Sequence, residues 1–597
     1  MNAKRKRFPG RYLVAIVVGT VSIVAIRSVT GDERGSAARG DCEHLTVVSS
    51  SEKADLLDDI ARRYEATDPR IDGRCAAVDV VAKPSGDATD ALVRGWDTTV
   101  EGPRPDVWTP VTSSWLEIAQ HRLADTDGPD LIPAQVEPIA SAPLVIAMPR
   151  PMAEAMGWPT DQIGWHDLFD LATDPRGWAR YGHPEWGRFT LGKTNPNFST
   201  SGLDALIGEY YAATGTSSDL TTGAIADPAV VRFVQGVESG VVHYGDISTT
   251  FLENLRRADE AGHGLTYVSA IAIEEKSVWD YNQGNPSGDI ATLGDQAHPS
   301  IPLAAVYPVE GTLVNDHPYA ILDAPWVSPI RRAIAEDFLR FVLAPEQQER
   351  FQEAGFRDHA GRPGDAVNPD NGLLPDQPAV TLSTPSAVVL DAIQRSWADL
   401  RKRAHVLLIL DVSGSMSEIA GGTGDSKLDL AKRAAVQALA QFEPDDAVGL
   451  WIFSSELGPG GSPWMELSPM SPLGPKREDL REQIGSLDTH GGTGLYATVD
   501  HAVDVMHGSF DADRINGIVV LTDGRNDYAD YTSVDPLVAK LTHQPADRFV
   551  RVFCIAYGHD ADMPALEQIS DASTGTTYDA SDPATIDDVF AAVISNF

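Results

Sequence analysis

Residues 405–416 read HVLLILDVSGSM, a largely apolar run followed at once by Asp411, Ser413 and Ser415. Such a run is typical of a strand that is buried on both faces. Three short oxygen-bearing side chains at alternate positions can converge on one point just past the end of that strand. A carboxylate and two hydroxyls are hard ligands, which favours Mg²⁺ or a similar cation over a soft metal.

Two further oxygen-bearing side chains downstream can complete the same site. Thr493 follows the glycine-rich segment 490–492, whose turns permit the backbone conformations that present a side chain inward. Asp523 follows the apolar run 515–521 (INGIVVL), which we expect to be another buried strand. Ligands of open α/β sheets lie at the carboxyl ends of the strands, so we expect all five side chains to meet there.

The rest of the last third alternates strands with helices, which predicts a doubly wound, Rossmann-like α/β domain over 404–597. We expect further strands at 448–453 and 550–555, and helices at 427–442, 477–487, 495–506, 562–570 and 583–594. The segment 455–475 is rich in Gly and Pro, and we expect an irregular insertion that flanks the site.

This region resembles a von Willebrand factor type A domain with a complete metal-ion-dependent adhesion site. The motif DxSxS is Asp411, Ser413 and Ser415, the distal threonine is Thr493 and the distal aspartate is Asp523. In that family the Ser and Thr hydroxyls bind Mg²⁺ directly, and the Asp residues act largely through water. The resemblance implies bound Mg²⁺, with Mn²⁺ or Ca²⁺ as substitutes, and a protein partner that supplies a carboxylate. The alternative is a metal-free type A fold that uses these residues as caps and turns.

The first half, 45–360, also alternates strand-like and helical runs, which predicts α/β structure with mostly parallel strands. Two serine-rich clusters, 49–51 and 199–201, fall at strand-to-helix turns. Helix N-termini expose free N–H groups, so both clusters suit a small polar or anionic solute. The alternative is that these residues are only N-caps.

The region 45–357 resembles the type II periplasmic binding proteins, the extracellular solute-binding family that often serves importers. That resemblance implies two α/β lobes joined by two or more crossovers, with the ligand in the cleft between them. We expect the cleft to include Ser50, Ser51, Trp108, Ser199, Thr200, Ser201 and Tyr281. The alternative for the two aromatic residues is a place in the core. The resemblance is carried by Val47–Tyr64, Asp106–Trp108, Ser141–Ala147, Lys193–Gly202 and Val306–Thr312.

Residues 187–194 (GRFTLGKT) match the phosphate-loop pattern G-x-x-x-x-G-K-[ST]. That chemistry requires a strand before the loop and a helix that opens at the Lys. Here the intervening residues are themselves strand-like, and Pro196 follows soon after the Lys. We therefore expect no nucleotide at this segment.

The N-terminus carries a basic cluster, KRKR at 4–7, followed by the uncharged apolar run 13–26. We expect a cytoplasmic tail over 1–11, a single transmembrane anchor over 12–29 and a linker over 30–44. The protein would be held in the cell membrane by this one anchor, with the bulk of the chain on the extracytoplasmic side. The alternative is a cleaved signal peptide with a small-residue site at 36–38, which would make the protein secreted.

Two of the three cysteines are positioned to form a disulfide. Cys42 and Cys75 each precede an apolar run, and the intervening 55–64 is an amphipathic helical pattern. A strand–helix–strand unit places both residues at the starts of neighbouring parallel strands, and an extracytoplasmic compartment is oxidising. Cys554 lies inside an apolar run, so we expect an inert core residue there.

Composition and motifs narrow the class of function. The net charge of −39 argues against nucleic acid and against an anionic membrane surface as partners. The sequence has no H-E-x-x-H zinc motif, no G-x-S-x-G nucleophile motif and no Cys–His pair in a context that suggests a catalytic site. We therefore expect a binding protein and not an enzyme. The first interpretation is a solute-binding module joined through 361–403, a linker and a connecting helix, to a Mg²⁺-dependent adhesion module. The alternative is a substrate receptor of an ABC-type importer with the type A domain as an accessory.

Overall fold

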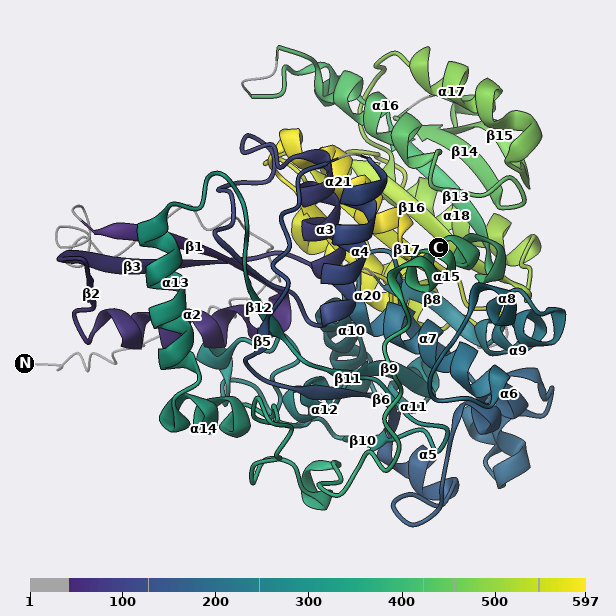
Figure 1. The fold of residues 1–597 in the computed structure, drawn as a ribbon. Coiled ribbons are helices and arrows are strands. Elements are labelled where there is room, and N and C mark those ends of the chain that lie inside the picture. The colour runs from purple at the N-terminus through teal and green to yellow at the C-terminus, as the bar shows by residue number, and fades with distance from the viewer. Residues whose placement is uncertain (1–41, 127, 246, 422–423, 456, 546–547) are drawn as a thin grey trace, which may run out of the picture.

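The computed structural model describes residues 42–597 apart from 127, 246, 422–423, 456 and 546–547. The described chain contains three six-stranded sheets, each with helices packed against it (Figure 1). Two of the sheets form a first lobe and a second lobe, and the third forms a C-terminal domain. This arrangement confirms the predicted α/β class, because strands and helices alternate through all three units.

The first lobe has the strand order β2-β3-β1-β4-β12-β5. Its central strands are parallel, while β12 returns from the second lobe and runs antiparallel to β4. The late helix α13 therefore lies beside the N-terminal strands, and α14 follows at its lower end (Figure 1). The strands are β1 (Glu43–Ser49), β2 (Arg70–Ile71), β3 (Arg74–Ala82), β4 (Val107–Thr109), β5 (Glu137–Pro138) and β12 (Pro318–Ile321). The helices are α2 (Ser51–Glu65), α3 (Ser85–Arg94), α4 (Ser113–Asp125), α13 (Pro329–Val342) and α14 (Pro345–Glu353).

The second lobe has the strand order β10-β6-β9-β7-β8, with β11 also paired to β6. The chain enters this lobe from β5 to β6 and leaves it from β11 to β12. Strand β6 is antiparallel to β9 and β10, so this sheet is mixed, in contrast to the mostly parallel sheet expected. The strands are β6 (Ala142–Pro149), β7 (Leu191–Thr194), β8 (Val241–Gly245), β9 (Ala270–Glu274), β10 (Leu303–Val306) and β11 (Val314–Asn315). The helices are α5 (Arg150–Ala155), α6 (Trp165–Thr173), α7 (Thr200–Thr214), α8 (Thr222–Ile225), α9 (Pro228–Glu238), α10 (Ser248–Glu260), α11 (Gly264–Tyr267) and α12 (Glu275–Asn282).

The C-terminal domain has the order β15-β14-β13-β16-β17-β18, with all strands parallel except the edge strand β15. Strand β15 lies within 455–475, where we expected an irregular insertion. Pro469 and Pro472 conceal it in the sequence, and an edge strand tolerates them because its outer N–H groups need no partner. The strands are β13 (Arg403–Asp411), β14 (Ala447–Phe453), β15 (Trp464–Pro472), β16 (Arg514–Thr522), β17 (Arg551–Tyr557) and β18 (Thr577–Ala580). The helices are α16 (Lys427–Ala438), α17 (Arg477–Gly485), α18 (Leu495–Gly508), α19 (Asp535–Thr542), α20 (Met563–Ala572) and α21 (Ile586–Ile594).

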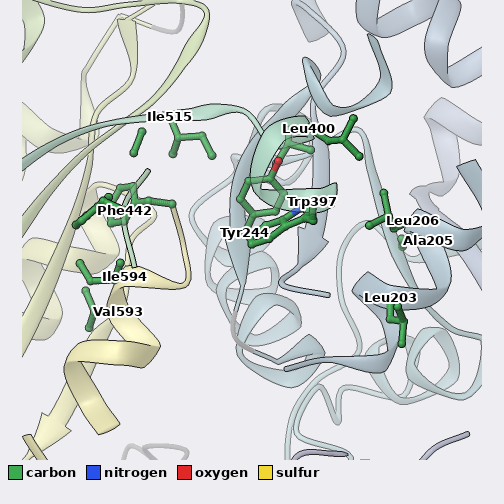
Figure 2. Packing of buried hydrophobic residues seen from close by; sticks show 14 of the residues in the cluster. Leu203, Ala205, Leu206, Tyr244, Trp397, Leu400, Phe442, Ile515, Val593 and Ile594 are labelled. Carbon is green, nitrogen blue, oxygen red and sulfur yellow. The ribbon is translucent and has the colours of Figure 1, made fainter. Parts of the chain in front are cut away.

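The C-terminal domain packs against the second lobe through a shared hydrophobic core. Helix α15 (Ala387–Leu400), close to the predicted connecting helix, supplies Trp397 between the two units. The Trp397 and Tyr244 rings pack edge-on with their centroids 5.1 Å apart. Figure 2 shows this pair between side chains of the C-terminal domain, such as Phe442 and Val593, and side chains of α7, such as Leu206. The two units thus share one core and are not separated by a flexible spacer.

Hydrogen bonds of backbone and side-chain groups reinforce this contact at the amino ends of the C-terminal strands. The Tyr244 N–H donates to the Asn596 carbonyl at 2.9 Å, and the Lys402 N–H donates to the Tyr244 hydroxyl at 3.0 Å. The Arg401 guanidinium donates to the Phe597 carbonyl at 2.7 Å and pairs with buried Asp446. The edge strand β8 of the second lobe is therefore joined to the start of β13 and to the end of α21.

The segment 361–386 has little regular structure, as expected for a linker, but it is packed and not free. Val367, Leu373 and Leu382 are buried. The Thr312 N–H donates to the Val380 carbonyl at 3.1 Å, which ties the segment to the second lobe. Burial of these apolar side chains holds the path of the chain between the lobes and α15.

No helix within the described residues is both long and apolar enough to cross a membrane. The expected cytoplasmic tail (1–11), anchor (12–29) and most of the linker (30–44) lie outside the described residues.

The predicted disulfide is present between Cys42 and Cys75, which are 33 residues apart in the sequence. The parallel pairing of β1 with β3 aligns Glu43 with Ala76, so the residues just before them face each other with Cα atoms 4.7 Å apart. The buried thiol of Cys554 is free, in agreement with the predicted core role.

We expect the double variant Cys42→Ser/Cys75→Ser to unfold with a free energy lower by about 3–4 kcal/mol, because its unfolded chain is no longer cross-linked. Urea unfolding measures the difference. As a control, a reductant should lower the stability of the wild type and leave that of the double variant unchanged. Equal loss of stability in both proteins would contradict the prediction.

Candidate functional site

Parallel strands β13 and β16 bring Asp411 and Thr522 to the same edge of the C-terminal sheet. Their register pairs Leu410 with Leu521, so the next residues of both strands are neighbours. The Thr522 hydroxyl donates to Asp411 Oδ2 at 2.5 Å, and the Ser413 N–H donates to Asp411 Oδ1 at 2.7 Å. Asp411 is fully buried. Both carboxylate oxygens are therefore fixed by local contacts that follow directly from the strand pairing.

The remaining members of the DxSxS segment reach across to Asp523. The hydroxyl oxygens of Ser413 and Ser415 lie 3.0 Å apart, and the Ser415 hydroxyl donates to Asp523 Oδ1 at 2.7 Å. The Lys427 ammonium, at the start of α16, contacts Asp523 Oδ2 at 2.9 Å and Glu418 at 2.9 Å. Buried Asp523 thus presents one oxygen to the site and the other to a lysine.

The loop before α18 places Thr493 beside these groups. Asp527 Oδ1 accepts from the Thr493 N–H at 2.5 Å, and the Gly414 N–H donates to the Gly491 carbonyl at 2.9 Å. A Cβ atom added at Gly524 would lie 3.1 Å from Thr493 Oγ1 and 3.7 Å from Ser415 Oγ. The glycine therefore leaves open the space that these two hydroxyls border, and all five predicted residues come together.

Burial dominates the electrostatics of the site. It raises the pKa of Asp411 to about 7, the Thr522 and Ser413 hydrogen bonds oppose that shift, and the Asp523 charge adds to it. No group of three or more His, Cys, Asp or Glu side chains in the described chain is placed to hold a metal, so the donor set depends on hydroxyls.

Sequence reasoning missed Lys427, Thr522 and Asp527. Thr522 directly precedes Asp523 at a strand end, which was a usable signal.

The hydroxyls predicted to line the interlobe cleft already have partners within the protein. The Ser50 hydroxyl accepts from the Lys53 ammonium at 2.7 Å, and the Thr200 hydroxyl accepts from Trp115 Nε1 at 2.8 Å. The remaining contacts are Ser199 with Thr194 at 2.8 Å and Ser201 with Ser248 at 3.1 Å. The Trp115 contact joins α4 of the first lobe to α7 of the second, so these residues lie where the lobes meet. Ser51 opens α2.

Two aromatic residues expected in the cleft are members of hydrophobic cores. Trp108, on the central strand β4, and Tyr281, on α12, are 1% and 2% exposed. Trp108 is part of the large core cluster, and Tyr281 packs in the core of the second lobe. Burial raises the pKa of the Tyr281 hydroxyl. Both rings thus contribute to hydrophobic cores, and their part in ligand binding stays a prediction.

Comparison with known proteins identifies the families that the two parts of this chain match. The model of the bacterial extracellular solute-binding proteins matches residues 45–357, and the model of the von Willebrand factor type A domain matches residues 405–592. The chain belongs to the bacterial extracellular solute-binding protein family. Its solute-binding domain is followed by a type A domain.

The chain is similar to relatives over most of its length and to solved structures over part of it. Uncharacterized proteins of two Mycobacterium tuberculosis strains, CDC 1551 and H37Rv, are each 24% identical over 94% of this chain and 79% of their own length. A periplasmic thiamin-binding protein is 14% identical, with a TM-score of 0.39 over 60% of this chain and 96% of its own. A type A protein from Catenulispora acidiphila is 20% identical, with a TM-score of 0.26 over 33% of this chain and 42% of its own.

The phosphate-loop pattern begins at the surface, at exposed Gly187 and Arg188, and ends in the core of the solute-binding domain. Lys193 is inside β7 and fully buried, and its ammonium contacts Glu209 at 2.7 Å and Glu238 at 2.5 Å. The residues after it form a turn before α7 begins at Thr200. This geometry lacks the helix opening at the Lys that a phosphate loop needs.

A buried lysine of the solute-binding domain makes the free energy of unfolding depend on pH. Burial lowers the pKa of Lys53 to about 7, and nearby Glu52, Glu274 and Asp316 oppose the shift. Between pH 7 and 9 the unfolded chain therefore binds a proton at this position that the folded chain does not bind.

We expect the unfolding free energy of the wild type to rise with pH from 7 to 9, relative to Lys53→Met, by up to about 1.4 kcal/mol per pH unit. Denaturant unfolding across that pH range measures the slope. Lys476→Met, at a partly exposed position of the type A domain, is the control and should keep the wild-type slope. A Lys53→Met slope equal to that of the wild type would contradict the lowered pKa.

Proposed function

We propose that this protein is a membrane-anchored extracytoplasmic binding protein. Its type A domain binds a protein partner through Mg²⁺, and its solute-binding domain binds a small solute. The observation that carries the proposal is the convergence of Asp411, Ser413, Ser415, Thr493 and Asp523 at one edge of the type A sheet. Hydrogen bonds among caps and turns do not require all five side chains to meet around the open face of a glycine.

The donor set fits Mg²⁺. The Ser413, Ser415 and Thr493 hydroxyls would hold the ion, and the carboxylates of Asp411 and Asp523 would support it from behind. Mg²⁺ favours oxygen ligands and retains part of its hydration shell, so a partner carboxylate can join it. Neutral hydroxyl ligands leave the ion strongly attractive to such a carboxylate. Mn²⁺ or Ca²⁺ can substitute on the same oxygen chemistry.

The placement of the site favours an external partner. The amino ends of the type A strands contact the second lobe, and the site lies at their carboxyl ends. Nine residues of β13 separate the two, a distance of about 26 Å. Gly414, His490 and Arg525 around the site are exposed, and so is Ile419, with 64% of its surface accessible. An exposed apolar side chain beside a cation site suits a protein surface that contributes a carboxylate.

A second candidate function is a substrate receptor of an ABC-type importer with the type A domain as an accessory. The bilobed arrangement with two crossovers favours it, because such lobes can close around a solute. Saturable solute binding together with a permease partner would distinguish this receptor from an adhesion protein. In both cases we propose that residues 12–29 anchor the chain and that no chemical reaction is catalysed.

For the metal site, we expect Mg²⁺ at about 100 times its dissociation constant to stabilise residues 42–597 by about 2.7 kcal/mol. Calorimetric titration and thermal unfolding measure binding and stabilisation. The double variant Ser415→Ala/Thr493→Ala should bind Mg²⁺ at least about tenfold more weakly. Asp479→Ala is the control, since it removes an exposed carboxylate of the same domain. A flat titration of the wild type would refute the metal site.

For the anchor, we expect the full chain to sediment with the membrane fraction when produced in a bacterial host, because an apolar segment of this length partitions into the bilayer. A chain lacking 1–29 should remain soluble. A mature N-terminus just after Ala38 in the released protein would instead show a cleaved signal peptide, and the anchoring proposal would fall.

A further inference from the structure

A cluster of polar side chains lies between the lobes of the solute-binding domain, apart from the type A site. We call it the interlobe cluster. Its members come from the first turn of α2 in the first lobe, from α7 and the end of β9 in the second, and from the crossover that leads into β12. They are Glu52, Lys53, Asp204, Glu274, Asn315, Asp316 and His317.

Several acceptor atoms of the interlobe cluster have no hydrogen-bond partner among the described residues. Both carboxylate oxygens of Asp204, Oε2 of Glu274 and Oδ1 of Asn315 are in this state. These side chains are 1%, 2% and 0% exposed. A buried acceptor without a partner costs about 1–3 kcal/mol, and a charged one costs more. A protein retains such groups where something else binds to them.

These acceptors belong to one connected site. The Asn315 amide donates to Glu274 Oε1 at 3.0 Å, and His317 Nε2 lies 3.3 Å from the same oxygen. Burial raises the pKa of Asp204 well above its usual range, the Asn315 side chain opposes the shift, and the charges of Glu274 and Asp316 add to it. The carboxyl groups of Asp204 and Glu274 therefore interact electrostatically, and the Asn315 side chain lies next to both.

The only lysine of the interlobe cluster does not neutralise these carboxylates by direct pairing. The Lys53 ammonium donates to Ser50 Oγ at 2.7 Å, to the Thr109 carbonyl at 2.8 Å and to the Pro110 carbonyl at 3.1 Å. Its three donors are thereby used. Four carboxyl groups thus share one lysine whose hydrogen bonds go elsewhere, and the other basic side chain of the cluster is His317, with Nε2 3.3 Å from Glu274 Oε1.

The same contacts disfavour an anionic solute. Asp316 occupies the N-terminus of α4, where it accepts from the Ser113 N–H at 2.8 Å and from the Ser113 hydroxyl at 2.5 Å. Ser50, at the N-terminus of α2, is taken by Lys53. The helix ends that suit an anion are therefore filled by side chains of this chain. The unpartnered atoms that remain are the oxygens of Asp204, Glu274 and Asn315, which accept, and the two ring nitrogens of His317.

We propose that the interlobe cluster binds a small solute bearing a protonated amine, whose N–H groups donate to Asp204, Glu274 and Asn315. This inference rests on the proposed solute-binding function and replaces the expected anionic solute with a cationic one. An amine suits the site because it supplies the N–H donors that these buried acceptors lack. The lobes are joined nearby, where the Gly86 N–H donates to the Phe198 carbonyl at 3.1 Å, so closure of the lobes encloses the amine.

The first experiment is thermal unfolding and calorimetric titration of residues 42–597 with four probes. They are methylammonium, putrescine, tetramethylammonium and inorganic phosphate. We expect the two N–H-bearing amines to raise the melting temperature and to give saturable heats. Tetramethylammonium carries the charge without N–H donors, and phosphate is the anion; neither should do so.

The second experiment repeats the titration on Asp204→Asn and Glu274→Gln, which keep the side-chain shape and remove the charge. We expect each to lose at least about tenfold in amine affinity, because a charged hydrogen bond in a buried site is lost. We also expect Asp204→Asn to melt no lower than the wild type without ligand, since a buried carboxyl with no partner is removed. Glu154→Gln, an exposed carboxylate of α5, is the control and should keep the wild-type response.

The outcomes separate this inference from the proposed function. Stabilisation by phosphate but by neither amine would overturn the amine inference while leaving solute binding in place. Absence of a response to both amines, or an unchanged amine response in both Asp204→Asn and Glu274→Gln, would overturn it as well. The Mg²⁺ titration of the type A domain is independent of all these results.

Discussion

The parallel pairing of β13 with β16 is the constraint on which the type A domain depends. Because the two strands end together, the buried carboxylate of Asp411 meets the Thr522 hydroxyl, and Asp523 follows within reach of Ser415. Each of these groups would be costly to bury alone. Held together by the strand ends, they satisfy one another and leave hydroxyl oxygens directed at a common space.

The opposite ends of the same strands determine how the molecule is joined. Lys402, just before β13, and Asn596, just after α21, hydrogen-bond to Tyr244 of the second lobe. Trp397 fills the space beside that contact. The type A domain is therefore attached by its amino-end face, and its candidate metal site faces away from the solute-binding domain. Any coupling between the two sites would have to pass through the sheet and this shared core.

The two candidate sites use buried polar groups in different ways. At the type A site the carboxylates are held by hydroxyls and by Lys427, so the donor set is prepared in advance. In the interlobe cluster Asp204 and Glu274 keep oxygens without partners, while Lys53 bonds elsewhere. The first arrangement suits an ion that brings its own water. The second suits a ligand that brings hydrogen-bond donors when the lobes close.

The sequence by itself determined the features that depend on local order along one strand or on adjacent strand ends. Residues 405–416, with Thr493 and Asp523, indicated the site because strand ends and glycine turns position their own side chains. The bond between Cys42 and Cys75 followed from the strand–helix–strand order, since parallel register aligns the strand starts. Only the tertiary structure decided which groups meet from elements far apart in the sequence. Asp204, Glu274 and Asn315 come from three separate elements of the second lobe, α7, β9 and β11, and no periodicity records their contact. The same holds for Lys53, which contacts nearby Ser50 in the sequence but also the Thr109 carbonyl of a separate strand.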